Sequence, residues 1–375
     1  MKRFIIPTFI FWRIGLYIIG FLSPFIIPIF GNRFPYWQTL LVDTGLPAFL
    51  WPWGNFDGVH YLTIATRGYE AQFTQAFFPL FPLLIRLCSF FFHLPLIISA
   101  MIISNVFTLI FLFLFYAFLK LEKYSQNAIH WTLIFTLLFP FSFFLGGIYN
   151  ESLFLSLVLI SFILFRKKKW FYAGLFGALA TSTRLIGIFL LPAFLWDVWK
   201  LYKKEKKFER GSLWIFLVPM GLICYMLYLQ LNFQDPFYFI HAQSVFGASR
   251  TGGEIILLPQ VIWRYIKILI TVPIVHYDFW VALWEIGSVI IFALFFILYA
   301  RRIKFSYTIF GVLTVLTPTL TGTFSSMPRY ILSAFPFFIL HTFIKNNIIK
   351  IILAIFYGVL LIIFTTLFLR GYWVS

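Results

Sequence analysis

Long apolar runs separated by short basic clusters make up most of this chain. A helix needs about 20 apolar residues to cross a bilayer, and the apolar runs approach or reach that length. The pattern predicts about eleven membrane-spanning helices, placed roughly over residues 8–28, 95–119, 128–147, 151–165, 170–183, 185–199, 212–232, 280–300, 305–321, 331–344 and 348–369. Several of these are shorter than a straight span, and we expect a break near Arg184.

The basic clusters orient this pattern in the membrane. Lys and Arg are enriched in cytoplasmic loops, so we place all six clusters in the cytoplasm: Arg166–Lys169, Lys200–Arg210, Arg301–Lys304, Lys2–Arg3, Lys120–Lys123 and Lys345–Lys350. Each apolar run between two clusters then crosses the membrane an even number of times. Two further stretches, 77–93 and 257–275, cannot span without moving a cluster outside. We therefore predict surface or re-entrant helices there, on the outer face.

The predicted fold class is an all-α membrane protein, a polytopic helical bundle. The start of the chain resembles a signal peptide but lacks a small-residue cleavage site, so we interpret it as a retained first span with a cytoplasmic N-terminus. No linker, repeat or low-complexity tract is visible. We expect one membrane domain over residues 1–375, with large outer segments at 29–94 and 233–279.

Composition supports this prediction and explains the charge. The chain is 62% hydrophobic, 23% aromatic and 11% charged, whereas soluble domains average about 45–50% apolar and about 25% charged residues. Under the predicted topology, the formal net charge of +17 divides into about +15 inside and about +1 outside, with Arg13 inside the first span. The positive charge therefore marks the cytoplasmic side, and a nucleic-acid partner loses its main support.

Metal and disulfide chemistry have little support in the sequence. Cys88 and Cys224 lie in apolar surroundings without partners at ligand spacing, and no disulfide framework is implied. Histidines 60, 241 and 276 are scattered along the outer segments. They lack the paired spacing of a zinc site, so we predict no metal site.

The unusual polar motifs all fall at the outer face of this topology. They are Trp51–Tyr69, Ala76–Arg86, Gly146–Ser152, Thr181–Arg184 and Ser325–Tyr330. Taken singly, each has an ordinary explanation: an interfacial aromatic belt, a packed proline turn, a helix cap, or an arginine that snorkels to the interface. Together they place a carboxylate, several arginines and many aromatic rings on one side. A carboxylate can act as base on a hydroxyl while cations hold a departing phosphate, and aromatic faces suit sugars.

Two of these motifs carry a family resemblance. The run from Asn55 to Tyr69, with Asp57 and His60, followed by Ala76-Phe-Phe-Pro79-Leu-Phe-Pro82, resembles the PIG-V family. Eukaryotic members of that family add the second mannose in GPI-anchor assembly, and bacterial homologues serve other acceptors. Phe56 stands where the family pattern has tryptophan. Similar segments follow at Phe139–Ser152 and Ala180–Gly187, with a fainter one at Arg329–Tyr330.

The resemblance implies a GT-C type glycosyltransferase of the cell membrane. Such an enzyme, here a mannosyltransferase, takes a sugar from a polyprenyl-phosphate donor at the non-cytoplasmic face and passes it to a glycan or lipid acceptor with inversion. The acidic residue of the first outer loop is the catalytic base in that class, and it matches Asp57. We assign substrate contacts to His60, Tyr61, Tyr149, Glu151, Arg184 and Arg329. No cofactor is implied, and most such enzymes need no metal.

A transporter of lipids or solutes, such as a flippase, is the alternative from another class. It would share the composition and an outer cavity. Coupled transporters, however, usually carry ionisable residues near the bilayer midplane and related halves. Here only Arg13 and Arg184 are expected to lie deep, and no internal repeat is visible. A purely structural scaffold leaves the clustered outer motifs unexplained.

Overall fold

A computed structural model describes residues 1–31, 34, 36–247 and 250–374. Helices make up 76% of the structure, and no strand occurs among the described residues, which confirms the predicted all-α class. The chain forms two compact units. The first unit consists of Met1–Ala71, Pro79–Leu159 and Ile344–Val374; the second consists mainly of Gln72–Phe78 and Ile160–Phe343. The prediction of one domain over the whole chain is not tested by this division.

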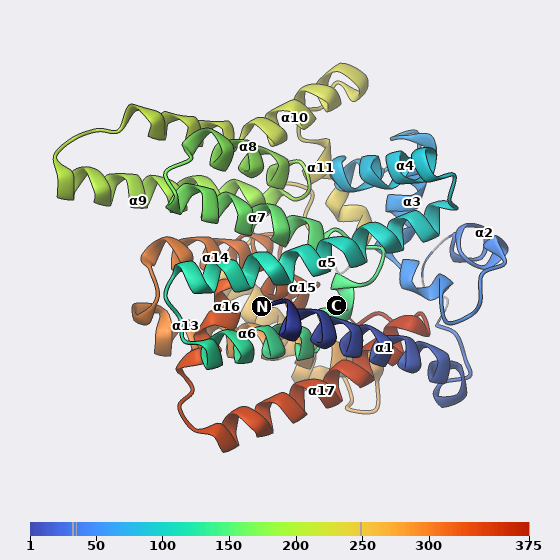
Figure 1. The fold of residues 1–375 in the computed structure, drawn as a ribbon. Helices are drawn as coiled ribbons and strands as arrows, with labels where there is room; N and C mark the ends of the chain where they lie inside the picture. The colour runs from blue at the N-terminus through green and yellow to red at the C-terminus, as the bar shows by residue number, and fades with distance from the viewer. Residues whose placement is uncertain (32–33, 35, 248–249, 375) are drawn as a thin grey trace. The chain divides into compact units, whose positions relative to one another are not determined.

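The first unit contains the long apolar helices α1, α5 and α17 together with shorter helices (Figure 1). Its helices are α1 (Lys2–Ile26), α2 (Trp37–Leu40), α3 (Asp57–Arg67), α4 (Leu80–Phe92), α5 (Leu96–Leu121), α6 (Gln126–Leu138), the first part of α7 (Glu151–Arg166) and α17 (Asn347–Leu369). Within this unit α1 packs along α17, and α4 packs against both α3 and α5. Short 3₁₀ turns at Val42–Thr44, Trp51–Gly54 and Ser142–Leu145 connect them.

The second unit alternates α-helices with short 3₁₀ segments. Its helices are α8 (Trp170–Thr181), η5 (Leu185–Phe189), α9 (Leu190–Glu205), η6 (Arg210–Leu217), α10 (Met220–Phe233), α11 (Tyr238–His241), η7 (Ala242–Phe246), α12 (Leu258–Thr271), α13 (Tyr277–Tyr299), η8 (Ala300–Arg302), α14 (Phe305–Thr319), α15 (Met327–Ser333), α16 (Pro336–Leu340) and η9 (His341–Phe343). A further 3₁₀ turn at Thr74–Ala76 belongs to it. Helix α8 packs on η6 and α10, and α14 packs on α9.

Six helices are long and apolar enough to cross a membrane among the described residues: Lys2–Ile26, Leu96–Leu121, Leu185–Glu205, Arg210–Phe233, Tyr277–Arg302 and Asn347–Leu369. They coincide with six of the eleven predicted spans. Shorter apolar helices stand at α4, α8 and α14. Helices also stand at both stretches predicted to lie on the outer face, 77–93 and 257–275. The count of eleven and the outer placement stay predictions.

Proline breaks two of the predicted spans. The helix expected over 128–147 ends at Leu138, because Pro140 holds Phe139 in an extended conformation with ψ 134°. The helix expected over 331–344 divides at Ala334, just before Pro336, whose nitrogen cannot donate a helical hydrogen bond. The break expected near Arg184 is confirmed: α8 ends at Thr181, and Arg184 is extended before η5 begins.

Helix α17 shows why these elements belong in a lipid environment. Tyr357, Leu360, Phe364 and Phe368 are buried on one face. From Ile348 onward, the exposed residues of α17 are all apolar, including Ile352, Ile355, Val359, Ile362 and Ile363. A helix that is apolar on both faces avoids water, and all its backbone hydrogen bonds close within the helix. The apolar exposed surface of α17 therefore supports the conclusion that this is a membrane protein.

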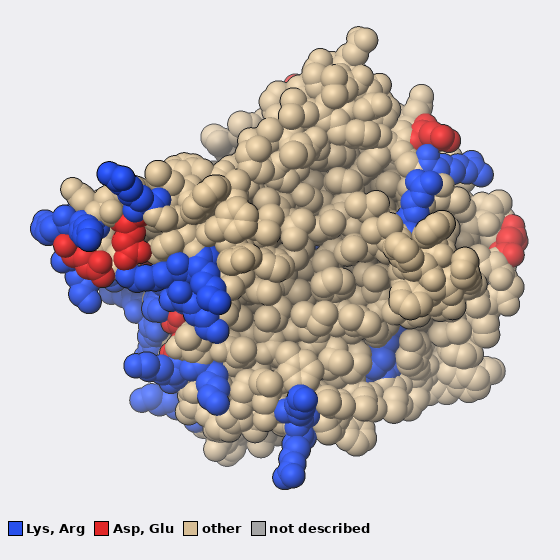
Figure 2. Space-filling view, turned by 45° about the horizontal axis from the view of Figure 1, so that its top comes forward, with Lys and Arg blue, Asp and Glu red and all other residues tan. Residues whose placement is uncertain are grey.

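The three strongest basic clusters lie at neighbouring helix ends of the second unit. Lys168 forms an ion pair with Glu209 at 2.5 Å, which joins the cluster after α7 to the cluster before η6. Trp196 of α9 packs on Phe305, the residue that follows the third cluster, with ring centroids 4.6 Å apart. Figure 2 shows a group of lysine and arginine side chains at the left of the view, with acidic side chains among them, and separate basic side chains at the bottom and the right. This grouping agrees with one common side for the three clusters.

Glycine permits the close crossing of α8 and α10, and this supplies a stability prediction. A Cβ added at Gly221 would lie 1.9 Å from the carbonyl oxygen of Ala178, a backbone atom that cannot move aside alone. We expect Gly221→Ala to destabilise the protein by about 1–3 kcal/mol through overpacking. The measurement is the thermal unfolding midpoint in detergent. Gly358→Ala in α17, where nothing lies within 4 Å of the added Cβ, is the control and should leave the midpoint unchanged or raise it. Equal midpoints for the two variants would contradict the crossing.

Candidate active site

Asp57 is the first residue of α3 and follows a buried turn. Trp51–Gly54 form a 3₁₀ turn, and Asn55 and Phe56 join it to the helix. Asn55 is fully buried, and its side-chain amide donates a hydrogen bond of 2.8 Å to the carbonyl oxygen of Phe368. Because α17 supplies this acceptor, a long apolar helix fixes the start of α3. Asp57 itself is only half-buried.

The residue before Asp57 has a strained backbone. Phe56 has φ 59° and ψ −114°, a conformation that a side chain with a Cβ rarely adopts. Its ring packs on Phe34, Phe368 and Trp373, at centroid distances of 4.6, 5.8 and 5.2 Å. Such strain costs of the order of 1–3 kcal/mol and persists only where the surroundings impose it. Strain of this kind is concentrated at functional sites, and here it directly precedes the predicted base.

A second predicted motif is hydrogen-bonded to this turn. The Tyr149 hydroxyl donates to the carbonyl oxygen of Asn55 at 2.7 Å, and the Ile148 amide donates to that of Trp53 at 2.9 Å. Glu151 follows at once as the first residue of α7 and is fully buried. The structure therefore joins the segments that carry Asp57 and Glu151, which lie far apart in the sequence. Each carboxylate begins a helix, where the helix dipole favours a negative charge.

His60 and Tyr61 differ in what they can contact. Asp57 and His60 are three residues apart on α3, so they share one face of the helix, and both are half-buried. Tyr61 is buried, and its ring packs edge-on against Phe81 and Tyr149, with centroids 5.0 and 6.5 Å apart. Tyr149 is also buried. The two tyrosines therefore belong to a packed aromatic wall, whereas the half-buried Asp57 and His60 are partly accessible.

Two other predicted motifs meet in the second unit. Arg184 lies in the break between α8 and η5, and its guanidinium sits 5.3 Å from the centre of the Tyr330 ring. Arg329, the neighbour of Tyr330, is buried in α15. Ser326, at φ 65°, precedes this helix in the left-handed region. The structure thus groups the predicted site residues as Asp57, His60, Tyr61, Tyr149 and Glu151 in the first unit, and Arg184 and Arg329 in the second.

Comparison with known proteins decides the family. The family model described as mannosyltransferase (PIG-V) matches residues 7–256, well over half of the chain. This chain belongs to the PIG-V mannosyltransferase family. The resemblance predicted from the sequence is thereby confirmed, and the matched region extends beyond the motifs that suggested it. The comparison with curated proteins found no match.

Family membership and the apolar helices together identify a membrane mannosyltransferase, which is a glycosyltransferase. The matched region contains Asp57, His60, Tyr61, Tyr149, Glu151 and Arg184, and Arg329 lies beyond it. Family membership favours the enzyme over the transporter alternative, because it assigns sugar transfer to the chain's relatives. The roles of the individual residues stay predictions.

The sequence did not point to the network that holds the loop 322–326, just before α15, in this PIG-V family member. The Tyr265 hydroxyl donates to the buried carboxylate of Glu285 at 2.5 Å and accepts from the Phe324 amide at 3.1 Å. Arg250 donates to Ser326 Oγ at 3.1 Å, and Arg264 donates to the carbonyl oxygen of Gly322 at 3.0 Å. A lone glutamate within the apolar run 280–300 was the one available signal, because an unpaired carboxylate there is costly.

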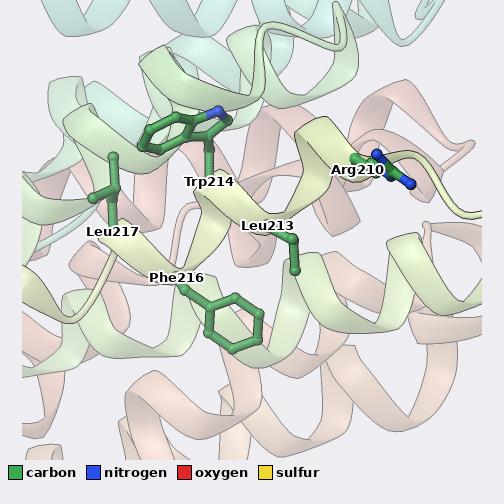
Figure 3. A pocket seen from close by; sticks show the side chains of 5 residues that line it. All are labelled: Arg210, Leu213, Trp214, Phe216 and Leu217. Atoms are coloured by element: carbon green, nitrogen blue, oxygen red, sulfur yellow. The ribbon is translucent and has the colours of Figure 1, made fainter.

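A surface pocket lies elsewhere in the second unit. It has a volume of 440 Å³ and is lined by Arg210, Leu213, Trp214, Phe216 and Leu217 of η6. In Figure 3, Trp214 and Leu217 rise on one side of the 3₁₀ segment while Phe216 and Leu213 lie on the other. No predicted site residue lines this pocket. Among the described residues, no group of three or more His, Cys, Asp or Glu side chains could hold a metal ion.

Burial and Asp57 act in opposite directions on His60, and this gives a pH prediction. Burial lowers the pKa of His60 below its ordinary value of 6.5, and the negative charge of Asp57 partly offsets the decrease. We expect Asp57→Asn to lower the pKa of His60 further, because the neutral amide no longer stabilises the imidazolium. The measurement is a titration of selectively ¹³C-labelled histidine by NMR. Asp43→Asn should leave the same resonance unchanged, and a higher pKa in Asp57→Asn would contradict the pairing.

Proposed function

We propose that this protein transfers a mannosyl group from a polyprenyl-phosphate donor to a hydroxyl of a glycan or lipid acceptor at the non-cytoplasmic face. Asp57 is the general base. One observation carries this proposal: a half-buried carboxylate begins a helix directly after a strained, fully buried and hydrogen-bonded turn. A base must be held within hydrogen-bond reach of the proton it removes, and a rigid mount supplies that accuracy.

The bond changes in this reaction are simple. The acceptor oxygen attacks the anomeric carbon of the mannosyl group and forms the new glycosidic bond. The bond from that carbon to the phosphate oxygen breaks, and its electron pair leaves with the polyprenyl phosphate. The acceptor proton passes to the Asp57 carboxylate. Direct displacement at one carbon inverts the anomeric configuration.

His60 and the aromatic wall have supporting roles in the proposal. His60 lies on the same half-buried face of α3 as Asp57, where it orients the acceptor hydroxyl or the sugar. Tyr61 and Tyr149 keep water from the inner side of the carboxylate, since both rings are buried. Glu151, at the start of α7, fixes the loop that is hydrogen-bonded to the Asp57 turn.

Arginine is suited to the leaving phosphate. A planar guanidinium can bind two phosphate oxygens at once and remains charged at any physiological pH. Arg184 is half-buried and lies over the Tyr330 ring, whereas Arg329, the residue before Tyr330, is buried. We assign Arg184 as the direct phosphate contact and Arg329 as a support for the segment around Tyr330.

The arrangement of helices in the second unit supports the proposal that Arg184 and Arg329 lie at the non-cytoplasmic face. Helix α9 runs from just after Arg184 to the basic cluster at its far end, and α14 runs from the Arg301–Lys304 cluster to the loop before α15. The two helices pack on each other. Arg184 and Arg329 therefore lie at the opposite helix ends from the basic clusters, which the positive-inside rule assigns to the cytoplasm.

Removing the carboxylate tests the proposed base. We expect Asp57→Asn to leave the yield and unfolding midpoint unchanged while mannosyl transfer falls by about 10²–10⁴-fold or more. The assay uses protein reconstituted in liposomes with radiolabelled polyprenyl-phosphate mannose, and it counts label in the glycosylated acceptor. The exposed Asp43, in the same predicted outer segment, supplies the control Asp43→Asn. Near-normal turnover in Asp57→Asn would refute the assignment, and lipid movement without transfer in the wild type would indicate a transporter.

A second variant tests the phosphate contact. We expect Arg184→Gln to raise the KM for the donor by about 10–100-fold, because a charge-assisted hydrogen bond to phosphate is lost. The KM for the acceptor should change little. Lys267→Gln, which removes an exposed charge from α12, is the matched control. An unchanged donor KM in Arg184→Gln, with transfer intact, would remove Arg184 from the site.

A further inference from the structure

A buried arginine stands beside the Asp57 turn, in a helix long enough to span the membrane. Arg13 lies midway along α1, and only 6% of it is exposed. Because the side chain is buried, snorkelling to the interface does not account for its position. A charged side chain within a membrane span is costly, and such residues usually have a functional role. The mechanism proposed above does not use it.

The guanidinium of Arg13 is held by aromatic rings. It lies 4.2 Å from the centre of the Tyr17 ring and 4.4 Å from the centre of the Trp53 ring, and it donates a hydrogen bond of 3.1 Å to the Tyr17 hydroxyl. Within the described part of the chain, no carboxylate forms an ion pair with it. Cation–π contacts gain strength when they are removed from water, as they are here.

Trp53 belongs to the turn that carries Asp57. Its ring is fully buried, and its indole N–H donates to the carbonyl oxygen of Phe49 at 3.0 Å. Its own carbonyl oxygen accepts the hydrogen bond from Ile148. Hydrogen bonds thus hold both the side chain and the backbone of Trp53. A displacement of Arg13 would therefore reach the backbone that leads into α3.

The same guanidinium also touches the loop that leads to Glu151. A Cβ added at Gly146 would lie 2.4 Å from Nη1 of Arg13, so a residue without a side chain is needed at that position. The neighbouring Trp12 donates from its indole N–H to Ser142 Oγ at 3.3 Å. Helix α1 therefore contacts both irregular segments, 51–57 and 142–150, through the adjacent side chains of Trp12 and Arg13.

We propose that Arg13 is a positioning residue for the transfer reaction: it clamps the Asp57 turn against the 142–150 loop through the Trp53 ring and the open space at Gly146. This inference rests on the proposed role of Asp57. An aliphatic side chain would fill the same volume without the cost of a buried charge. The planar cation adds a fixed stacking geometry on two ring faces, which a flexible apolar chain does not impose.

Five single variants and one double variant test the clamp. Arg13→Gln removes the cation, and Arg13→Lys keeps the charge without the planar stack. Gly146→Ala pushes against Nη1 from the loop side, and Gly15→Ala in the same helix is the control, because nothing lies within 4 Å of its added Cβ. Combining Gly146→Ala with Arg13→Ala measures the coupling between the two positions, since the shorter side chain makes room for the methyl group.

The first readout needs no substrate. Hydrogen–deuterium exchange of the detergent-solubilised protein should be faster by about tenfold in residues 51–58 and 142–150 in Arg13→Gln and Gly146→Ala. Exchange in α13 and in the Gly15→Ala control should stay as in the wild type. Gly146→Ala should add nothing in the Arg13→Ala background. Unchanged exchange in the two segments, or an equal increase throughout the chain, would overturn the clamp.

The second readout is the mannosyl transfer assay. We expect kcat to fall by about 10–100-fold in Arg13→Gln with the donor KM unchanged, because a small displacement of the base costs rate and not affinity. Arg13→Lys should recover only part of the loss. A rise in donor KM with kcat unchanged would make Arg13 a ligand contact and refute the positioning role. If the wild type transfers no mannose, the proposed function fails, and the exchange experiment alone decides whether the clamp exists.

Discussion

Buried backbone that is not helical must find its hydrogen bonds within the protein, and the candidate site depends on this constraint. An apolar environment offers no water to carbonyl and amide groups. The turn at 51–57 and the loop at 142–150 are hydrogen-bonded to each other. The Ile148 amide donates to the Trp53 carbonyl oxygen, and the Tyr149 hydroxyl donates to the Asn55 carbonyl oxygen. Asn55 adds a contact with the end of α17. These hydrogen bonds allow the backbone before Asp57 to be buried without being helical.

The same constraint operates in the second unit. The loop at 322–326 is buried, and it obtains its partners from side chains of α12 and from Arg250. The buried carboxylate of Glu285 accepts from Tyr265 and thereby orients the hydroxyl that meets the loop. In both units a helix that carries a predicted site residue begins immediately after, or close to, a residue with positive φ: Phe56 before α3 and Ser326 before α15.

Sequence periodicity and charge predicted the helical class and the broad order of the helices. Apolar runs are local signals, and a bilayer-length run leaves few other structures available. Motif spacing also indicated the family and the candidate site residues. Two predicted helices, over 128–147 and 331–344, are interrupted at Pro140 and Pro336, although their apolar composition suggested that each was continuous.

The three-dimensional grouping of the site could not be predicted in the same way. The substrate contact predicted for Tyr149 stays a prediction, and nothing in the sequence indicated that its hydroxyl donates to the carbonyl oxygen of Asn55, more than ninety positions earlier. Arg13 appeared only as a deep charge, since nothing in the sequence near it shows that Trp53 and Gly146 surround it. Such contacts depend on which distant loops meet, and composition and spacing do not encode that in one sequence.

Phe56 carries a consequence for the evolution of this enzyme. A glycine at position 56 would adopt φ 59° without strain, and the protein would gain stability if backbone strain were the only term. It would also lose the ring that holds the turn against Phe34, Phe368 and Trp373. Removal of a buried phenylalanine side chain costs about 3–5 kcal/mol, which exceeds a backbone strain of about 1–3 kcal/mol. Packing of the Phe56 ring therefore holds the residue in a backbone conformation that it would not adopt by itself. Selection for stability and selection for turnover should both retain a large aromatic side chain at position 56.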